Sequence, residues 1–329
     1  MRFSIQWLLV ALLIIPGPAC QPREDVSTLA VASASPLMTI LGQREYEVHQ
    51  RLTVINEGPG QPEKQNLWVA LIRDFLPYQK VVSKKVSPTD FELITDEYGN
   101  QYAEFDLSSQ PAGTTQTVQI DYQVTINELT YDVSACEGEL PDDFIQPELH
   151  IESANPQISA LASELTRGKS TVCQQVRAFY DYIGDELTYT YNGKNWGAQA
   201  ALGAMGADCT EYTALLVALS RSRGIPARYF EGLLFLDTDT EARARLEHAW
   251  PDMYMPGVGW VALDPTLGRS PGDRENYFAH YTPQHIIVTT GVNPSTLRGS
   301  SYWTHIYWPG DSTRIRVEAE EWQIKPIGK

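Results

Sequence analysis

The segment that decides the fold of this 329-residue chain is residues 206–219, GADCTEYTALLVAL. Its second half is continuously apolar, and Gly224 and Pro226 provide a stop signal further along, so a helix is predicted from about Cys209 to Arg223. Cys209 then lies where a loop becomes a helix. The unpaired N–H groups and the dipole at a helix N-terminus favour an anion, so they would favour a nucleophilic thiolate at this position.

Hydrophobic periodicity on either side of this helix predicts an α+β arrangement. Before the helix, apolar residues recur at three- and four-residue steps in two runs, which indicates two amphipathic helices. The residues of these runs are Ile158, Leu161 and Leu165, then Val172, Val176, Phe179, Tyr180 and Ile183. After the helix, strands are predicted at 227–236, 247–255 and 259–263. Helices that precede a largely antiparallel sheet define the α+β class.

An imidazole and a carboxylate lie in the last two of these strand segments. His248 is near the start of one segment, Asp264 follows the other, and Pro256-Gly257-Val258-Gly259 joins them. If the joining residues form a hairpin turn, both side chains return to the same end of the ribbon. The carboxylate would hold the ring in one tautomer, and the other ring nitrogen would face the Cys209 thiol as base and later as acid. This is the logic of a catalytic triad with Cys in place of Ser.

Residues 42–130 are predicted to form an all-β, sandwich-like domain. Apolar and polar residues alternate there with period two, which is typical of half-buried antiparallel strands. The apolar positions are Tyr46, Val48, Leu52 and Val54, then Val118, Ile120, Tyr122, Val124 and Ile126. No residue cluster in this region indicates chemistry, so packing or docking is its expected role. The tail from Thr313 to Ile324 also alternates and is predicted to add one more strand.

The N-terminus is predicted to be an export signal. An almost unbroken apolar run from Ile5 to Ile15 follows Met1-Arg2, and it is shorter than the ~20 residues of a membrane-spanning helix. The Ala19-Cys20 junction resembles a bacterial lipoprotein signal, in which the Cys is lipidated after cleavage. Residues 1–20 are therefore the expected signal peptide and residues 21–41 a flexible tether. Plain secretion after cleavage near Ala19 is the alternative.

Three cysteines remain once Cys20 is set aside: Cys136, Cys173 and Cys209. An exported protein lives where disulfides persist, and an odd count leaves one thiol free. A bridge between Cys136 and Cys173 is one possibility. Two buried, inert thiols are the other, because sequence does not supply the geometry that a disulfide needs.

Composition argues against a nucleic-acid partner. The chain has 41 acidic and 25 basic residues, a net charge of −16, and no Lys/Arg-rich run that could bind phosphates. The acidic run 237–241 is interpreted as a solvated loop, because Ala242 stands where a calcium-binding EF-hand loop needs Gly. His280 and His285 lack the spacing of a helical ligand pair. No metal and no cofactor are expected.

Four motifs in this order resemble the core of the transglutaminase-like superfamily. They are Gly206-x-x-Cys209-x-Glu211-Tyr212, Arg221 to Arg228, His248-Ala249-Trp250 and Gly259-Trp260-x-x-Leu263-Asp264-Pro265-Thr266. The resemblance covers about residues 155–270 and implies a papain-like fold, with Cys209 as nucleophile, His248 as general base and Asp264 as its orienting group. It places this core within a domain at 131–329 that ends in a strand extension. The preceding β-domain is similar to those found ahead of this core in exported bacterial members.

The donors that would stabilise the oxyanion are the least defined part of this predicted site. A papain-type protease has a Gln six residues before its Cys, but that position is Gly203 here. The backbone N–H of Cys209 can supply one donor, and Trp196 or Gln199 is a candidate for the second.

Two functions from different classes fit these features. In the first, the protein is a cofactor-free thiol enzyme that performs acyl transfer or hydrolysis on peptide or protein amides through a Cys209 thioester. In the second, a retained fold binds protein or cell-wall peptide without turnover. Either version is expected outside the cytoplasmic membrane, held there by an N-terminal lipid anchor or secreted, with a protein or peptide partner of the cell envelope.

Overall fold

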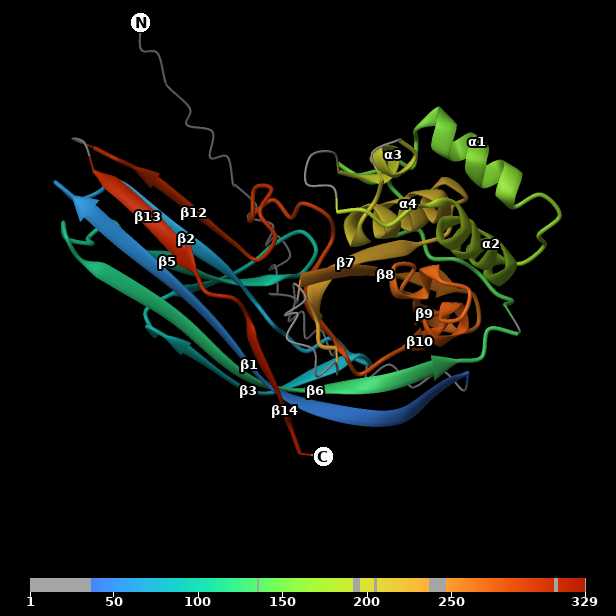
Figure 1. Cartoon of the computed structure of the whole chain (residues 1–329), viewed down its shortest axis with the longest axis horizontal. Coiled ribbons are helices and arrows are strands. Elements are labelled where there is room, and N and C mark those ends of the chain that lie inside the picture. The colour runs from blue at the N-terminus through green and yellow to red at the C-terminus, as the bar shows by residue number, and fades with distance from the viewer. Residues whose placement is uncertain are drawn as a thin grey trace, which may run out of the picture. The chain divides into compact units, whose positions relative to one another are not determined.

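Two long antiparallel strands, β1 (Met38–Gly58) and β6 (Thr115–Tyr131), form the base of the computed structural model and appear in Figure 1 as long blue and green arrows. The structure describes residues 37–134, 136–191, 196–203, 206–236, 247–310 and 313–328. The predicted signal peptide with Cys20 and the acidic run 237–241 lie outside these residues. Of the predicted tether 21–41, the last four residues belong to β1.

The period-two pattern of the sequence matches the burial of these two strands. Tyr46, Val48, Leu52 and Val54 are all buried in β1, and the five alternating positions predicted in β6 are buried as well. The ladder pairs Val48 with Tyr122, and Leu52 with Val118. Because opposed residues of an antiparallel pair project to the same face, both strands present one continuous apolar surface.

Two sheets combine the strands of the N-terminal half with strands from the C-terminal end of the chain. In the first, the strand order is β10-β6-β1-β13, with β14 also pairing with β1 and β3 with β6; the second has the order β12-β2-β5-β4. Their bounds are β2 Lys64–Leu71, β3 Gln79–Ser87, β4 Glu92–Thr95, β5 Gln101–Asp106, β10 His280–Tyr281, β12 Trp303–Trp308, β13 Arg314–Ala319 and β14 Gln323–Ile327. The Tyr122 hydroxyl of β6 accepts a hydrogen bond from the N–H of Ile72, next to β2, so the sheets are in contact.

The C-terminal strands return to these N-terminal sheets. The tail predicted as one strand folds as two, β13 and β14, and both pair with β1, while β12 pairs with β2. The predicted boundary between the two domains at residue 131 stays a prediction. The strand pairing places the last strands beside β1 and β2 rather than beside the strands of the predicted core. Alternating residues identify a strand, whereas its partner depends on which sheet edge is open to it.

The α+β class predicted for the chain is confirmed, and its helices pack against a third sheet. The helices are α1 Pro156–Leu165, α2 Val172–Glu186, α3 Ala198–Ala201 and α4 Cys209–Ser222, with short 3-10 turns η1 Leu267–Arg269 and η2 Arg274–Asn276. The sheet has the order β11-β7-β8-β9, with β7 Ala227–Leu234, β8 Glu247–Met255, β9 Gly259–Ala262 and β11 His285–Thr290. Figure 1 shows the four helices gathered on one side of β7 and β8.

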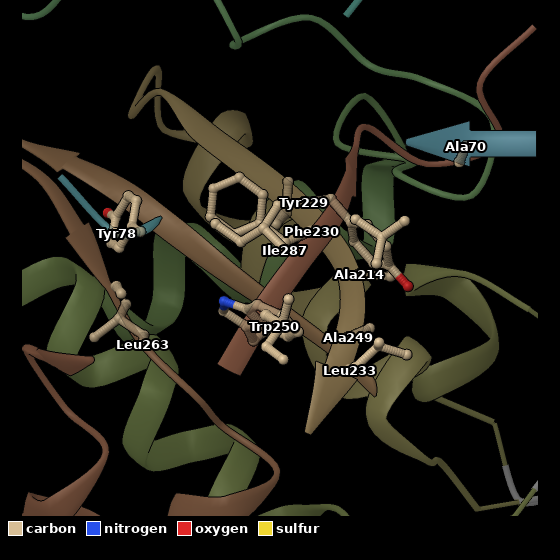
Figure 2. Packing of buried hydrophobic residues seen from close by; sticks show 14 of the residues in the cluster. Ala70, Tyr78, Ala214, Tyr229, Phe230, Leu233, Ala249, Trp250, Leu263 and Ile287 are labelled. Atoms are coloured by element: carbon tan, nitrogen blue, oxygen red, sulfur yellow. The ribbon is translucent and has the colours of Figure 1, made fainter. Parts of the chain in front are cut away.

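Helix α4 is the central element of this part of the chain. Its residues from Glu211 to Arg221 are all buried, which is expected of a helix with apolar residues around its whole circumference. Large side chains fill the sheet beneath it, among them Trp250 and Phe230 (Figure 2). The centroid of the Trp250 ring lies 6.1 Å from that of Phe230 and 4.8 Å from that of His285. Trp250 is therefore part of the hairpin core.

Two buried amide side chains cover the outer edge of β11. Gln79 donates to the carbonyl of Ile287 (2.9 Å) and accepts from its N–H (2.8 Å), and Asn100 pairs with both backbone groups of Thr290 in the same way, each at 2.8 Å. An unpaired strand edge needs such partners when it is buried. The amides of the N-terminal half thus satisfy backbone groups that another strand would otherwise pair.

Candidate active site

Cys209 is the first residue of α4, as predicted. Its neighbours form a capping box: the Asp208 side chain accepts from the Thr210 N–H (3.0 Å), and Glu211 accepts from the Asp208 N–H (3.0 Å). Because the first N–H groups of a helix have no intrahelical acceptor, the backbone N–H of Cys209 is available to a developing oxyanion. The Cys209 side chain is partly exposed, so a substrate can reach it.

His248 and Asp264 meet at the open end of the β8–β9 hairpin. The register pairs Met255 with Gly259, which brings the two residues back to the same end, and the Nε2 of His248 lies 2.8 Å from an oxygen of Asp264. The Cys209 thiol acts on the same imidazole, since it is one of the groups that raise the pKa of His248. Because Nε2 is engaged by the carboxylate, Nδ1 is the nitrogen left for the sulfur.

The electrostatics of this pair favour an imidazolium at neutral pH. Burial lowers the pKa of His248, but attraction and hydrogen bonding from Asp264, together with the Cys209 thiol, more than offset it and raise that pKa to about 10. Burial likewise opposes ionisation of Asp264, yet His248 and His285 hold the pKa of its carboxyl below the usual range. A raised His pKa stabilises the folded state below the ordinary value of 6.5, and this contribution is lost as the pH rises through about 10.

A second histidine, His285, contacts the same carboxylate and was not predicted from sequence. Its Nε2 lies 3.0 Å from the Asp264 oxygen that His248 also contacts, and its Nδ1 lies 2.9 Å from the Thr282 hydroxyl. Burial lowers the pKa of His285, so the neutral ring donates through Nε2. The other Asp264 oxygen accepts from two backbone N–H groups, those of Thr266 and Leu267, each at 2.9 Å. No local pattern around His285 signals this contact, because β11 is brought to Asp264 only by the sheet.

We expect His285→Phe to slow alkylation of Cys209 by iodoacetamide by roughly tenfold near pH 7. The phenyl ring keeps the packing against Trp250 but removes one of the four donors to Asp264, so the carboxylate orients His248 less firmly. Thr282→Val is the matched control, because it removes only the partner of His285 Nδ1. Equal rates in the wild type and His285→Phe would mean that His285 fills space and does not position Asp264.

Among the described residues, His248, Asp264 and His285 form a group that could hold a metal ion. Donor atoms of His248, Asp264 and His285 all lie within 4.8 Å of one another. Tetrahedral zinc with bonds of about 2.0 Å separates its ligand atoms by roughly 3.3 Å. The two N–O distances here, 2.8 and 3.0 Å, are those of direct hydrogen bonds. The geometry therefore favours a hydrogen-bonded network over a set of metal ligands.

The two candidate oxyanion donors lie before α4. Trp196 lines a pocket together with Thr210, and its side chain is half exposed. Gln199 lies in α3, where its backbone N–H donates to Glu152 (3.2 Å). Neither contact brings these residues to the Cys209 thiol, so the second donor stays a prediction.

The other two cysteines are joined in a disulfide. Cys136 and Cys173 are bridged with their Cα atoms 5.8 Å apart, which is within the usual range. The bridge connects the segment after β6 to the first turn of α2. Cys209 is therefore the free thiol of the described residues.

We expect His248→Ala to slow iodoacetamide labelling of Cys209 by about ten- to a hundredfold near pH 7, because the imidazolium that stabilises a thiolate is removed. Labelling is read by mass spectrometry of the Cys209 peptide. His280→Ala is the control, since this histidine pairs with Glu128 (3.0 Å) and makes no described contact to the site. If Cys209 is labelled at the same rate in the wild type and in His248→Ala, the imidazole does not activate the thiol.

A known protein family matches the part of the chain that carries Cys209, His248 and Asp264. Residues 159–265 match the sequence profile of the transglutaminase-like superfamily. This segment includes α4, the β8–β9 hairpin and the Cys209, His248 and Asp264 side chains. It is therefore a transglutaminase-like core, and the resemblance drawn from the four motifs is confirmed.

Individual relatives match only in part. The Bacillus subtilis protein YebA is 26% identical over 134 residues, which are 36% of this chain and 18% of that protein. A protein-glutamine gamma-glutamyltransferase of Pseudomonas aeruginosa is 27% identical over 159 residues, 44% of this chain and 24% of that protein. The chain therefore matches less than a quarter of either relative.

A crystal structure from Cytophaga hutchinsonii, described as a candidate cysteine protease, has a similar fold. It aligns with a TM-score of 0.63 and 16% sequence identity, and the alignment covers 88% of this chain and 92% of that one.

Proposed function

We propose that the protein is a thiol enzyme that acts on peptide or protein amide groups through an acyl-enzyme on Cys209. The observation that carries the proposal is the 2.8 Å hydrogen bond between His248 and Asp264, on an imidazole whose pKa the Cys209 thiol also raises. Each member has the position that covalent catalysis requires: a partly exposed nucleophile at a helix N-terminus, a buried base and a buried, ionised carboxylate.

The reaction needs no group beyond these residues and water. The Cys209 thiolate attacks the amide carbonyl, and the backbone N–H of Cys209 donates to the oxyanion. The C–N bond breaks, His248 gives its proton to the departing nitrogen, and a thioester remains. Water or a second amine then attacks the thioester, His248 accepts a proton from the attacking group, and the thiolate leaves. Asp264 keeps the ring oriented throughout.

The products decide which amide is attacked and what accepts the acyl group. Peptides with Gln side chains, offered with and without a primary amine, would be followed separately for ammonia release, amine incorporation and new chain termini. Amine incorporation is the activity named for the Pseudomonas relative, and new termini would fit the protease description of the Cytophaga protein. Ammonia release alone would indicate a deamidase. Peptide binding with none of these products would favour a non-catalytic binding module.

We further propose that the enzyme works outside the cytoplasmic membrane, anchored by a lipid on Cys20. The support is the apolar run that ends at Cys20. In the described residues, no helix has the length and hydrophobicity to cross a bilayer.

In a bacterial host, the wild type is expected to partition with membranes and to carry a lipid-sized mass increment on its N-terminal peptide. Cys20→Ser should be recovered in the soluble fraction without that increment. A soluble wild type with unmodified Cys20 would leave plain secretion as the explanation of the apolar run.

A further inference from the structure

An exposed arginine, Arg269, is held in one position at the end of η1. Its guanidinium donates to the carbonyl of Thr266 (2.6 Å), and its Cζ atom lies 4.8 Å from the centroid of the Tyr189 ring. An arginine on a protein surface ordinarily samples many rotamers, and fixing it costs conformational entropy. Here the side chain is fixed by a carbonyl and an aromatic ring, neither of which carries a negative charge.

The two segments that meet at this contact both belong to the surroundings of the candidate active site. The turn that ends at Arg269 holds the Asp264 carboxylate through two backbone N–H groups. Tyr189 forms a parallel bridge with Ala207, two residues before Cys209. The stacking of Arg269 on Tyr189 therefore joins the turn after Asp264 to the segment that leads into Cys209.

Arg269 lies toward the face of α4 that bears Cys209. Tyr212 follows Cys209 by three residues, so the two side chains share a helix face, and the Tyr212 ring lies 6.2 Å from that of Tyr189, centroid to centroid. Burial raises the pKa of Tyr212, and the charge of Arg269 opposes that rise. At about 100° per residue, the pocket lined by Thr210 lies on the other side of Cys209. A substrate at Cys209 would thus have the pocket on one side and Arg269 on the other.

The guanidinium retains donors for a ligand. It has five N–H donors in a planar fork, and in the described part of the chain the uncharged Thr266 carbonyl is its one hydrogen-bond acceptor. The chain has a net charge of −16, so its overall field disfavours an anionic ligand. A fixed cation near the nucleophile would offset this repulsion locally.

We infer that Arg269 binds a carboxylate of the substrate, close to the amide that Cys209 attacks. The substrate role rests on the proposed function. The planar fork of a guanidinium matches the two oxygens of a carboxylate, and such charge-assisted pairs are the strong ones. Because Tyr189 already holds the fork, little further freedom is lost on binding. In a peptide, the carboxylate can belong to an acidic side chain or to the C-terminus.

Binding to the full-length Cys209→Ala variant tests this inference without turnover. Three matched pairs of peptides are titrated: acetyl-Ala-Gln-Glu-amide and acetyl-Glu-Gln-Ala-amide, each against the peptide with Gln in place of Glu, and acetyl-Ala-Gln-Ala with a free against an amidated C-terminus. The carboxylate member of at least one pair is expected to bind about tenfold more tightly. Adding Arg269→Gln should remove this advantage. Arg269→Lys keeps the charge without the fork and should retain part of it.

Arg223→Gln is the matched control, because it removes the same charge from the far end of α4, about 21 Å along the helix from Cys209. The inference would be overturned if no pair showed a preference, if the preference survived Arg269→Gln, or if Arg223→Gln removed it equally. Equal weakening of charged and neutral peptides by Arg269→Gln would also overturn it, because Arg269 would then only support the turn after Asp264.

The pair that shows the preference identifies the source of the carboxylate. A preference in either Glu pair assigns Arg269 to an acidic side chain, and a preference in the third pair assigns it to the C-terminus. A carboxylate preference combined with no product from the wild type would refute the proposed chemistry and leave the role of Arg269 standing. Product formation without any preference would do the reverse.

Discussion

Replacing Cys209 by alanine is expected to abolish product formation from peptide amides, with a loss of at least about 10⁴-fold. The thioester cannot form without the sulfur, and no other free thiol exists in the described residues, because Cys136 and Cys173 are bridged. Product formation is measured by the three separate readouts of ammonia release, amine incorporation and chain cleavage. The thermal unfolding temperature should change little, because Cys209 is only partly buried.

If Cys209 and His248 act as a unit, replacing His248 should reduce product formation about as much as replacing Cys209. The rate of His248→Ala should therefore be nearly as low as that of Cys209→Ala. The double variant should be barely slower than either single one, because the effects of residues that act as a unit are not additive. Cys209→Ser keeps a hydroxyl near His248 and is the conservative control for side-chain packing. Full activity in Cys209→Ala would refute the thioester mechanism, whichever product forms.

Replacing Asp252 by alanine is expected to lower the free energy of unfolding by about 3–5 kcal/mol, because it leaves the Arg228 cation buried without its partner. Asp252 is fully buried and accepts from the Nε of Arg228 (2.9 Å), from a second guanidinium nitrogen of Arg228, and from the hydroxyl of Tyr78 (2.9 Å). Burial opposes the Arg228 charge, but Asp252 more than offsets it and raises the pKa of Arg228. The guanidinium also stacks 3.8 Å above the centroid of the Trp260 ring.

Urea unfolding of the wild type and two variants measures this effect. Glu275→Ala is the control, because it breaks an ion pair with Arg177 in which the Glu275 side chain is 72% exposed, and such pairs contribute at most about 1 kcal/mol. A loss below about 1 kcal/mol in Asp252→Ala would mean that Arg228 turns out to solvent when its partner is removed.

The His248–Asp264 pair and its hairpin could be predicted because their determinants are close together in the chain. The β8–β9 turn needs only the glycines at 257 and 259, both with positive φ, and the register then brings His248 and Asp264 to one end. The start of α4 is equally local, since Asp208 and Glu211 form its capping box. His285 could not be predicted in the same way, because its contact with Asp264 requires β11 to pair with β7.

The amino-acid sequence by itself determined the periodic elements, the family of the core and the order of its three candidate catalytic residues. Periodicity, capping and turn chemistry act over a few residues, so they can be recognised without knowing the fold. Only the tertiary structure decided that the C-terminal strands pair with β1 and β2, that His285 contacts Asp264, and that Gln79 and Asn100 cover β11. These last contacts join residues 208 and 190 positions apart. Such hydrogen bonds form only after separate segments have docked, and no local sequence pattern encodes the surface that each segment meets.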